Sequence, residues 1–160
     1  MSDLVCQPSI VPPSPAEDAT PIVNDGWFPD VNPALLKQQA RIHDSVTAPR
    51  LEEAVLAAII TVNNDLAAYK AEKQAAGHAT LAAVPSLELN GESRLQILYR
   101  RAIASLVKAE LIEKYRDFDQ TGAGQRDTGE LDQSIGALRR DATHAIRDIL
   151  GRGRTTVELL

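Results

Sequence analysis

The fold is decided by one stretch, residues 91–119, which reads GESRLQILYRRAIASLVKAELIEKYRDFD. Its apolar side chains recur mostly every four residues, at Leu95, Tyr99, Ile103, Val107, Leu111, Tyr115 and Phe118. A second set widens this face, at Leu98, Ala102, Leu106 and Ala109. Four-residue spacing places side chains on one side of an α-helix, and a broad apolar face is typical of a central helix with two neighbours. We therefore expect a long central helix here, with Leu106 at the centre of a bundle.

Two other stretches predict the neighbours of this helix. Residues 48–76 follow the start signal Thr47-Ala48-Pro49 and end before Gly77, with apolar positions three or four apart at Leu51, Val55, Ile59, Val62, Leu66 and Tyr69. A third helix follows the capping pair Asp127 and Glu130 and ends at Gly151, with its stripe at Leu131, Ile135, Leu138, Ala142, Ala145 and Ile149. Asn32-Pro33 predicts a short helix to about Arg41, and residues 78–90 a loop. The predicted fold is all-α: an elongated bundle of three long helices plus a short N-terminal helix.

Both ends of the chain differ in composition from this helical domain, which we expect over residues 27–151. Seven of the nine prolines lie in residues 1–33, so residues 1–26 are expected to form an extended or disordered arm. Trp27 and Phe28 follow; they either fold back onto the helical core or anchor the chain in a neighbour's pocket. Residues 152–160 form a tail of strand-forming character, which is either frayed or able to pair with another chain's sheet edge.

Composition argues against several classes of protein. The net charge is −5, whereas a dedicated nucleic-acid binder is more often basic. Cys6 is the only cysteine, so neither an intrachain disulfide nor a cysteine metal cluster is expected. The start of the chain does not resemble a secretory signal, and no window is apolar enough to span a membrane. The histidines lie in three different segments and form no catalytic or metal-binding pattern, so we expect no enzyme activity, metal or cofactor.

Charge is spread unevenly along the chain. Residues 1–46 hold six acidic and two basic side chains, a net −4, and residues 139–154 hold five arginines and two aspartates, a net +3. Unlike ends of this kind could orient head-to-tail packing of identical subunits. They could equally serve only to keep the ends soluble. A third possibility is that the C-terminal arginines bind DNA phosphates, which would make the chain a DNA-binding or packaging accessory protein.

Four segments, residues 27–70, 77–85, 91–119 and 138–160, resemble the head completion proteins of P2-like tailed bacteriophages in the order and spacing of their residues. The resemblance implies a helical connector subunit of the virion, made in the host cytoplasm, which forms a dodecameric ring under the capsid portal. Such a ring stabilises the DNA-filled head and gives the tail its attachment surface. The implied partners are the portal, other copies of the chain and a tail-proximal neck or tail terminator protein, while packaged DNA passes through without specific binding.

The family offers no catalytic residues to carry over. By the same resemblance, the C-terminal end is the segment expected to dock on the portal or the adjacent subunit, through Arg152, Arg154, Thr155, Thr156, Val157, Glu158, Leu159 and Leu160.

Overall fold

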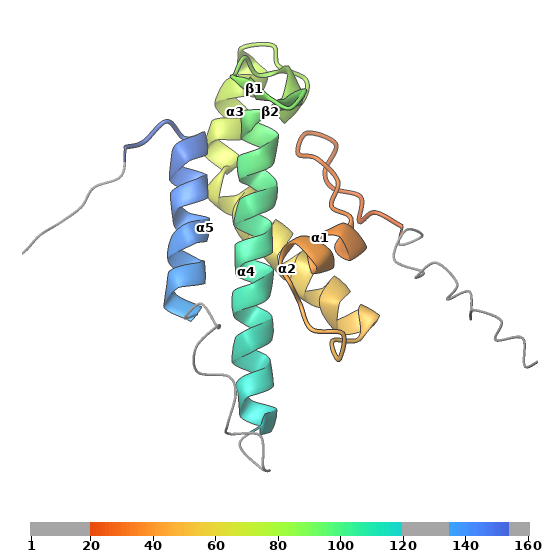
Figure 1. Ribbon diagram of the computed structural model, residues 1–160. Coiled ribbons are helices and arrows are strands. Elements are labelled where there is room, and N and C mark those ends of the chain that lie inside the picture. The colour runs from red at the N-terminus through yellow and green to blue at the C-terminus, as the bar shows by residue number, and fades with distance from the viewer. Residues whose placement is uncertain (1–19, 120–134, 154–160) are drawn as a thin grey trace, which may run out of the picture.

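The computed structural model describes residues 20–119 and 135–153 of the chain (Figure 1). Its α-helices are α1 (Pro33–Gln39), α2 (Ala48–Asp65), α3 (Ala67–Ala75), α4 (Arg94–Asp119) and α5 (Ile135–Ile149). A 3₁₀ helix, η2 (Leu81–Ala83), and a two-stranded hairpin, β1 (Glu88–Leu89) and β2 (Glu92–Ser93), connect α3 to α4. The described chain is thus mostly helical, in agreement with the predicted class, although the small hairpin was not expected.

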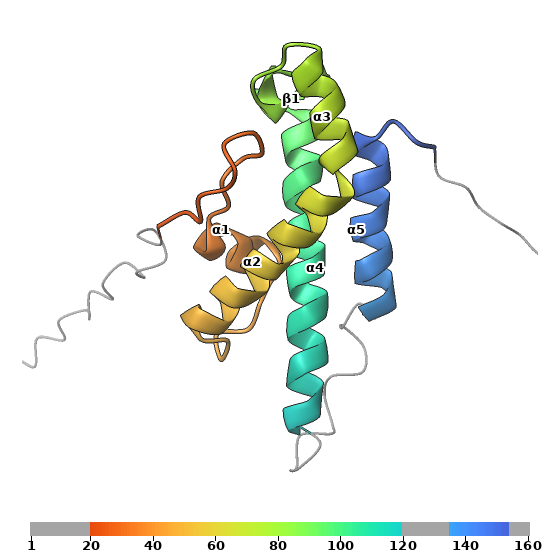
Figure 2. The same ribbon diagram turned by 180° about the vertical axis from the view of Figure 1, so that it is seen from behind.

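Helix α4 forms the centre of the molecule. With 26 residues it is about 39 Å long at 1.5 Å per residue. It runs antiparallel to α5 on one side, and α2 crosses it on the other (Figures 1 and 2). The side chains of Tyr99, Ile103 and Val107 are fully buried at this junction. The predicted central helix with two neighbours is therefore confirmed.

The expectation for Leu106 was wrong. Its side chain is only partly buried and lies at the margin of the core, beside the α2 residues Ala57 and Thr61. Leu106 lines a depression that also contains charged side chains, those of Glu110, Glu113, Lys114 and Arg139, so this part of the apolar face borders a polar surface. The second apolar set is therefore buried unevenly, with Ala102 and Ala109 inside and Leu106 at the edge.

The predicted single helix over residues 48–76 is divided in two at Leu66. The backbone there leaves the regular helical conformation, with φ −98° and ψ 4°, and separates α2 from α3. Three residues of low helix propensity, Asn63, Asn64 and Asp65, precede the break. Hydrogen bonds from the Leu66 amide to the Val62 carbonyl (3.0 Å) and from the Lys70 amide to the Leu66 carbonyl (2.9 Å) continue across it. The break is therefore a bend, and it keeps the buried Leu66 side chain in the core.

The hairpin is formed by the Asn90-Gly91 pair. Both residues have positive φ, 54° and 75°, as a two-residue type I′ turn requires. Glu88 pairs with Ser93 and Leu89 with Glu92 on either side of it. The loop expected over residues 78–90 therefore contains a strand, and its partner strand leads directly into α4.

The helix ends agree with the capping signals in the described part of the chain. The Asn32 side chain accepts hydrogen bonds from the Ala34 and Leu35 amides (2.9 and 3.2 Å), and Pro33 begins α1. Gly77 and Gly151 follow α3 and α5 with positive φ of 91° and 68°, the left-handed conformation that commonly ends helices. The start signals expected at Asp127 and Glu130 lie outside the described residues.

The segment 20–31 folds back against the helices. An antiparallel bridge joins Ile22 and Val31, with N–H···O distances of 2.8 and 3.1 Å. Trp27 and Phe28 are each only 3% exposed and belong to the main core. Of the two interpretations of this pair, the structure supports packing onto the chain's own helices. Residues 20–26 of the expected arm thus contact the folded domain, and residues 1–19 lie outside the described residues.

Candidate interaction surface

A polar cluster fastens the segment 22–31 to the helical core. The Tyr99 hydroxyl on α4 donates a hydrogen bond to Asn63 Oδ1 on α2 (2.6 Å) and accepts one from Asn24 Nδ2 (2.7 Å). Asn63 Nδ2 in turn donates to Asn24 Oδ1 (2.9 Å). We call these three residues the Tyr99 cluster. Burial raises the pKa of Tyr99 well above its ordinary value, against a smaller lowering by the hydrogen bond from Asn24, so the hydroxyl stays protonated and can donate.

Asp25 supports the same segment from its other side. Its Oδ1 accepts hydrogen bonds from the amides of Trp27 and Phe28, both at 3.0 Å, and its Oδ2 forms an ion pair with Lys70 Nζ of α3 at 2.6 Å. Burial tends to raise the pKa of Asp25, but the hydrogen bonds from Lys70 and the two amides outweigh it and lower the pKa below its usual value. The aromatic rings complete the contact, since Phe28 stacks on Tyr99 at a centroid distance of 4.9 Å.

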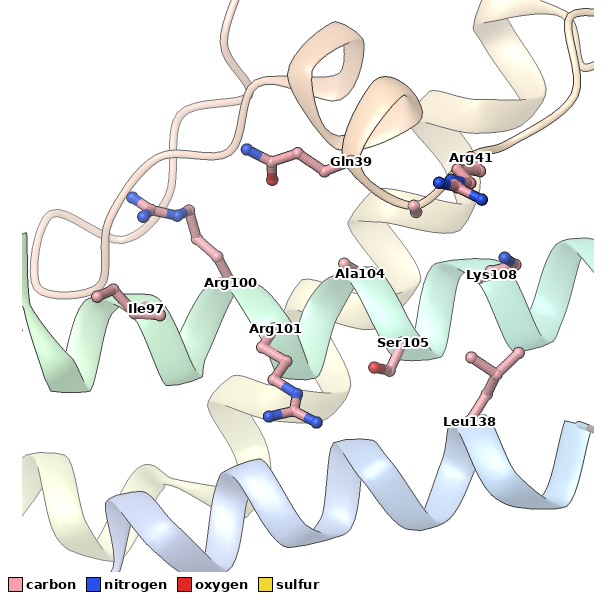
Figure 3. A pocket seen from close by; sticks show the side chains of 10 residues that line it. Gln39, Arg41, Ile97, Arg100, Arg101, Ala104, Ser105, Lys108 and Leu138 are labelled. Atoms are coloured by element: carbon pink, nitrogen blue, oxygen red, sulfur yellow. The ribbon is translucent and has the colours of Figure 1, made fainter. Parts of the chain in front are cut away.

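A groove rich in positive charge lies between α1, α4 and α5, with a volume of about 840 Å³. We call it the basic groove; it is lined by Gln39, Ala40, Arg41, Ile97, Arg100, Arg101, Ala104, Ser105, Lys108 and Leu138. Figure 3 shows Gln39 and Arg41 on the α1 side, and Arg101 and Ser105 pointing from α4 towards α5. Its lining contains four cations and no acid, together with apolar side chains at Ala40, Ile97, Ala104 and Leu138.

Three of the four cations in the basic groove have no acidic partner. Arg100 forms an ion pair with Glu92 of β2. For Arg41, Arg101 and Lys108, no ion pair is present within the described ranges 20–119 and 135–153. Guanidinium groups bind carboxylates and phosphates through paired hydrogen bonds. The groove is therefore suited to an anionic ligand that also offers apolar contacts.

Sequence reasoning missed both the Tyr99 cluster and the basic groove. Charged residues on the helices were interpreted as solvated faces, and Arg41 is separated from Arg101 by 60 positions in the chain. One signal was present, because Arg101 and Lys108 lie seven residues apart on one face of α4. No acidic residue interrupts that face between them.

The expected docking residues at the C-terminus are only partly visible. Arg152 is exposed just after α5, its amide donating to the Arg147 carbonyl (2.9 Å). Arg147 Nη2 also donates to the Gly153 carbonyl (2.7 Å), which fastens the first residues of the tail to the helix. Residues 154–160 lie outside the described residues. Of the arginines proposed for DNA contact, Arg139 forms an ion pair with Glu113 (2.6 Å) and Arg147 bonds to the Gly153 carbonyl. These two arginines therefore already have partners within the chain.

The structure also bears on metal binding and membrane insertion. Within the part of the chain that it describes, His, Cys, Asp and Glu side chains do not gather in groups of three or more that could hold a metal ion. No helix in this part is both long and apolar enough to cross a membrane.

Comparison with known proteins places the chain in a family. A model of the phage head completion protein family (GPL) matches residues 22–160. The chain belongs to this family. It is 34% identical over 149 residues to the head completion/stabilization protein of Escherichia phage P2, covering 93% of this chain and 88% of the relative. A probable head completion/stabilization protein of Haemophilus phage HP1 is 28% identical over 143 residues, which cover 89% of this chain and 94% of the relative.

No solved structure matches the chain. The resemblance inferred from the sequence is confirmed. The family match treats the two ends differently, because it extends through the C-terminal tail but begins at residue 22, within the proline-rich arm expected over residues 1–26.

Proposed function

We propose that the chain is a structural virion protein that forms a ring under the capsid portal, stabilises the DNA-filled head and provides the surface to which the tail attaches. The observation that carries this proposal is the family match over residues 22–160, together with the 34% identity to a head completion/stabilization protein. A protein that completes a packaged head acts after the genome has entered, and the portal vertex is the opening that then remains. The proposed partners are the portal, further copies of the chain, and a tail-proximal neck or tail terminator protein.

The arrangement of the molecule supports assembly into a ring. A closed ring uses heterologous contacts, in which one surface of a subunit meets a different surface of the next. The two ends of the described chain lie on opposite sides of α4 (Figures 1 and 2). The regions that lead to them carry opposite charge, net −4 over residues 1–46 and net +3 over residues 139–154. Complementary charge on opposite sides favours head-to-tail association, for which we propose a dodecamer that matches the portal.

The C-terminal tail is the proposed docking segment. Gly151 ends α5, and the sequence after it contains the strand-forming residues Thr155, Thr156 and Val157. An extended segment of this kind can add a strand to an exposed sheet edge of a partner. The family match includes the whole tail, which is expected of a segment that serves the family's common role.

Deletion of residues 155–160 tests the docking role. Because these residues follow the last helix, we expect far-UV circular dichroism and the melting temperature to stay nearly unchanged, while incorporation into phage heads is abolished. A matched control replaces Thr155 and Thr156 by valine, which keeps strand propensity and length and is expected to retain incorporation. If the shortened chain unfolds, the tail belongs to its own core. If it still enters heads at the normal level, the tail is not the docking segment.

A further inference from the structure

The N-terminal part of the chain is strongly acidic and contains no positive side chain. Residues 1–36 hold five acids, Asp3, Glu17, Asp18, Asp25 and Asp30, and no lysine, arginine or histidine. Three of the five lie in residues 1–19, which we call the acidic arm. The basic groove offers three cations without acidic partners. The three carboxylates of the arm therefore equal in number the three cations of the groove.

The acidic arm enters the folded domain close to this groove. Thr20, the first described residue, lines a depression between α1 and α2 whose charged lining residues are Lys37, Arg41, Asp44 and Glu52. Arg41 also lines the basic groove, so it connects the two surfaces. The Tyr99 cluster and the Ile22–Val31 bridge fix the segment that follows Thr20 and thus the point from which the arm starts.

The acidic arm is long enough to occupy the groove of its own chain. An extended residue spans at most about 3.3–3.6 Å, so Glu17 can lie up to about 10 Å from Thr20 and the whole arm can reach about 65 Å. A segment tethered at this range has an effective concentration of the order of millimolar, which favours its own groove over that of a second molecule. Beside its cations, the groove is lined by the apolar side chains of Ile97, Ala104 and Leu138, which the apolar residues of a peptide can contact.

We propose that the acidic arm docks in the basic groove of its own chain. The carboxylates of the arm pair with Arg41, Arg101 and Lys108, and its apolar residues contact Ile97, Ala104 and Leu138. Exposed ion pairs are individually weak and are screened by salt, so the docked state is in equilibrium with a released state. Docking gives the cations of the groove acidic partners in the free subunit. If the proposed ring is correct, release of the arm on the portal would free both the groove and the acidic segment for neighbouring subunits.

A spin label on the arm tests the proposal directly, in the full chain. Because Cys6 is the only cysteine, the variant Cys6→Ser/Ala16→Cys carries a single nitroxide beside Glu17. At low salt, we expect strong paramagnetic broadening of the amide signals of Ala104 and Ser105. At about 1 M salt, where the Debye length is about 3 Å, the broadening should disappear.

Matched charge variants show whether the groove is responsible. Arg101→Gln/Lys108→Gln in the labelled chain should abolish the broadening, while Arg94→Gln/Arg140→Gln, which removes two exposed cations outside the groove, should leave it intact. Equal broadening in both double variants would overturn the proposal, as would its absence from the parent.

Two further results would assign the groove to another occupant and overturn the proposal. The first is broadening in a mixed sample, in which the spin label and the isotope label are on different molecules, since a second copy would then hold the arm. The second concerns a duplex of about 20 base pairs that binds the full chain at low salt. If Arg101→Gln/Lys108→Gln weakens this binding tenfold or more and Glu17→Gln/Asp18→Asn does not strengthen it, the groove is a phosphate site.

Discussion

Replacing Tyr99 with phenylalanine isolates the contribution of the Tyr99 cluster. The substitution keeps the ring that stacks on Phe28 and removes the hydroxyl that bonds to Asn63 and Asn24. Two hydrogen bonds are lost, each worth about 0.5–1.5 kcal/mol net. Asn24 Nδ2 keeps a bond to the Pro29 carbonyl (3.1 Å), and both amides are only partly buried, so water can replace part of what is lost. We expect the free energy of unfolding to fall by about 1–3 kcal/mol.

The assay is urea unfolding followed by far-UV circular dichroism and by the fluorescence of Trp27, the only tryptophan, which lies in the same core. For a chain of 160 residues the loss corresponds to a drop in melting temperature of roughly 2–4 °C per kcal/mol. Tyr69→Phe is the matched control, because no hydrogen bond of the Tyr69 hydroxyl is seen among the described residues. A loss below about 0.5 kcal/mol for Tyr99→Phe, the range of ordinary surface changes, would refute the reasoning.

The same substitution has a pH signature. The pKa of Tyr99 is raised in the folded chain, whereas an unfolded tyrosine titrates near 10. Between these two values the folded state binds more protons than the unfolded state, so the stability provided by the neutral hydroxyl is complete below about pH 10 and falls as the pH rises. Tyr99→Phe should therefore make the stability of the chain less sensitive to alkaline pH than that of the parent. An unchanged alkaline slope would show that the cluster does not keep the hydroxyl neutral.

Three further predictions concern the core, Asp25 and the tail. Ile103→Ala removes a fully buried side chain from the centre of α4 and should cost about 2–5 kcal/mol in urea unfolding, whereas Leu106→Ala at the edge of the core should cost clearly less; equal losses would contradict the packing described. The pKa of Asp25 is lowered on folding, so its contribution is present above the unfolded value near 3.9 and is lost as the pH falls through the folded value. In acid titrations monitored by Trp27 fluorescence, the stability of Asp25→Asn should therefore depend less on pH below about pH 4 than that of the parent. An acid transition identical to that of the parent would show that Asp25 does not stabilise the fold in this way. Deletion of residues 155–160 should abolish head incorporation at unchanged helical content, as measured in purified heads.

The helices could be predicted from the sequence because each depends on local periodicity and end signals. The stripes on α2, α4 and α5 are recognisable within windows of about 20 residues, and Asn32, Gly77 and Gly151 mark helix ends through their own conformations. The bend at Leu66 was missed because Val62, Leu66 and Tyr69 keep helical spacing across it. The hairpin could have been found, since an Asn-Gly pair is a strong two-residue turn signal.

The interaction surfaces could not be predicted because they depend on contacts between distant segments. In the Tyr99 cluster, Asn24 bonds to Asn63 and Tyr99, which lie 39 and 75 positions further along the chain. The basic groove likewise combines residues at the end of α1 with residues of α4. Local sequence patterns do not encode contacts between distant segments. The choice between a core position and an interface position for Trp27 and Phe28 likewise depended on where Leu81 and Tyr99 lie, since the Leu81 amide bonds to the Trp27 carbonyl (2.9 Å) and Phe28 stacks on Tyr99.

The ring at the portal is the central claim, and cryo-electron microscopy of the neck of assembled particles tests it most directly. We predict a ring of this chain between the portal and the first tail-proximal component, with the same symmetry as the portal and with residues 155–160 in contact with the portal or an adjacent subunit. Mass photometry of purified portal mixed with the chain should show an increase close to twelve copies of 17.3 kDa. A neck without density for this chain, or copies of it spread over the capsid shell, would contradict the account.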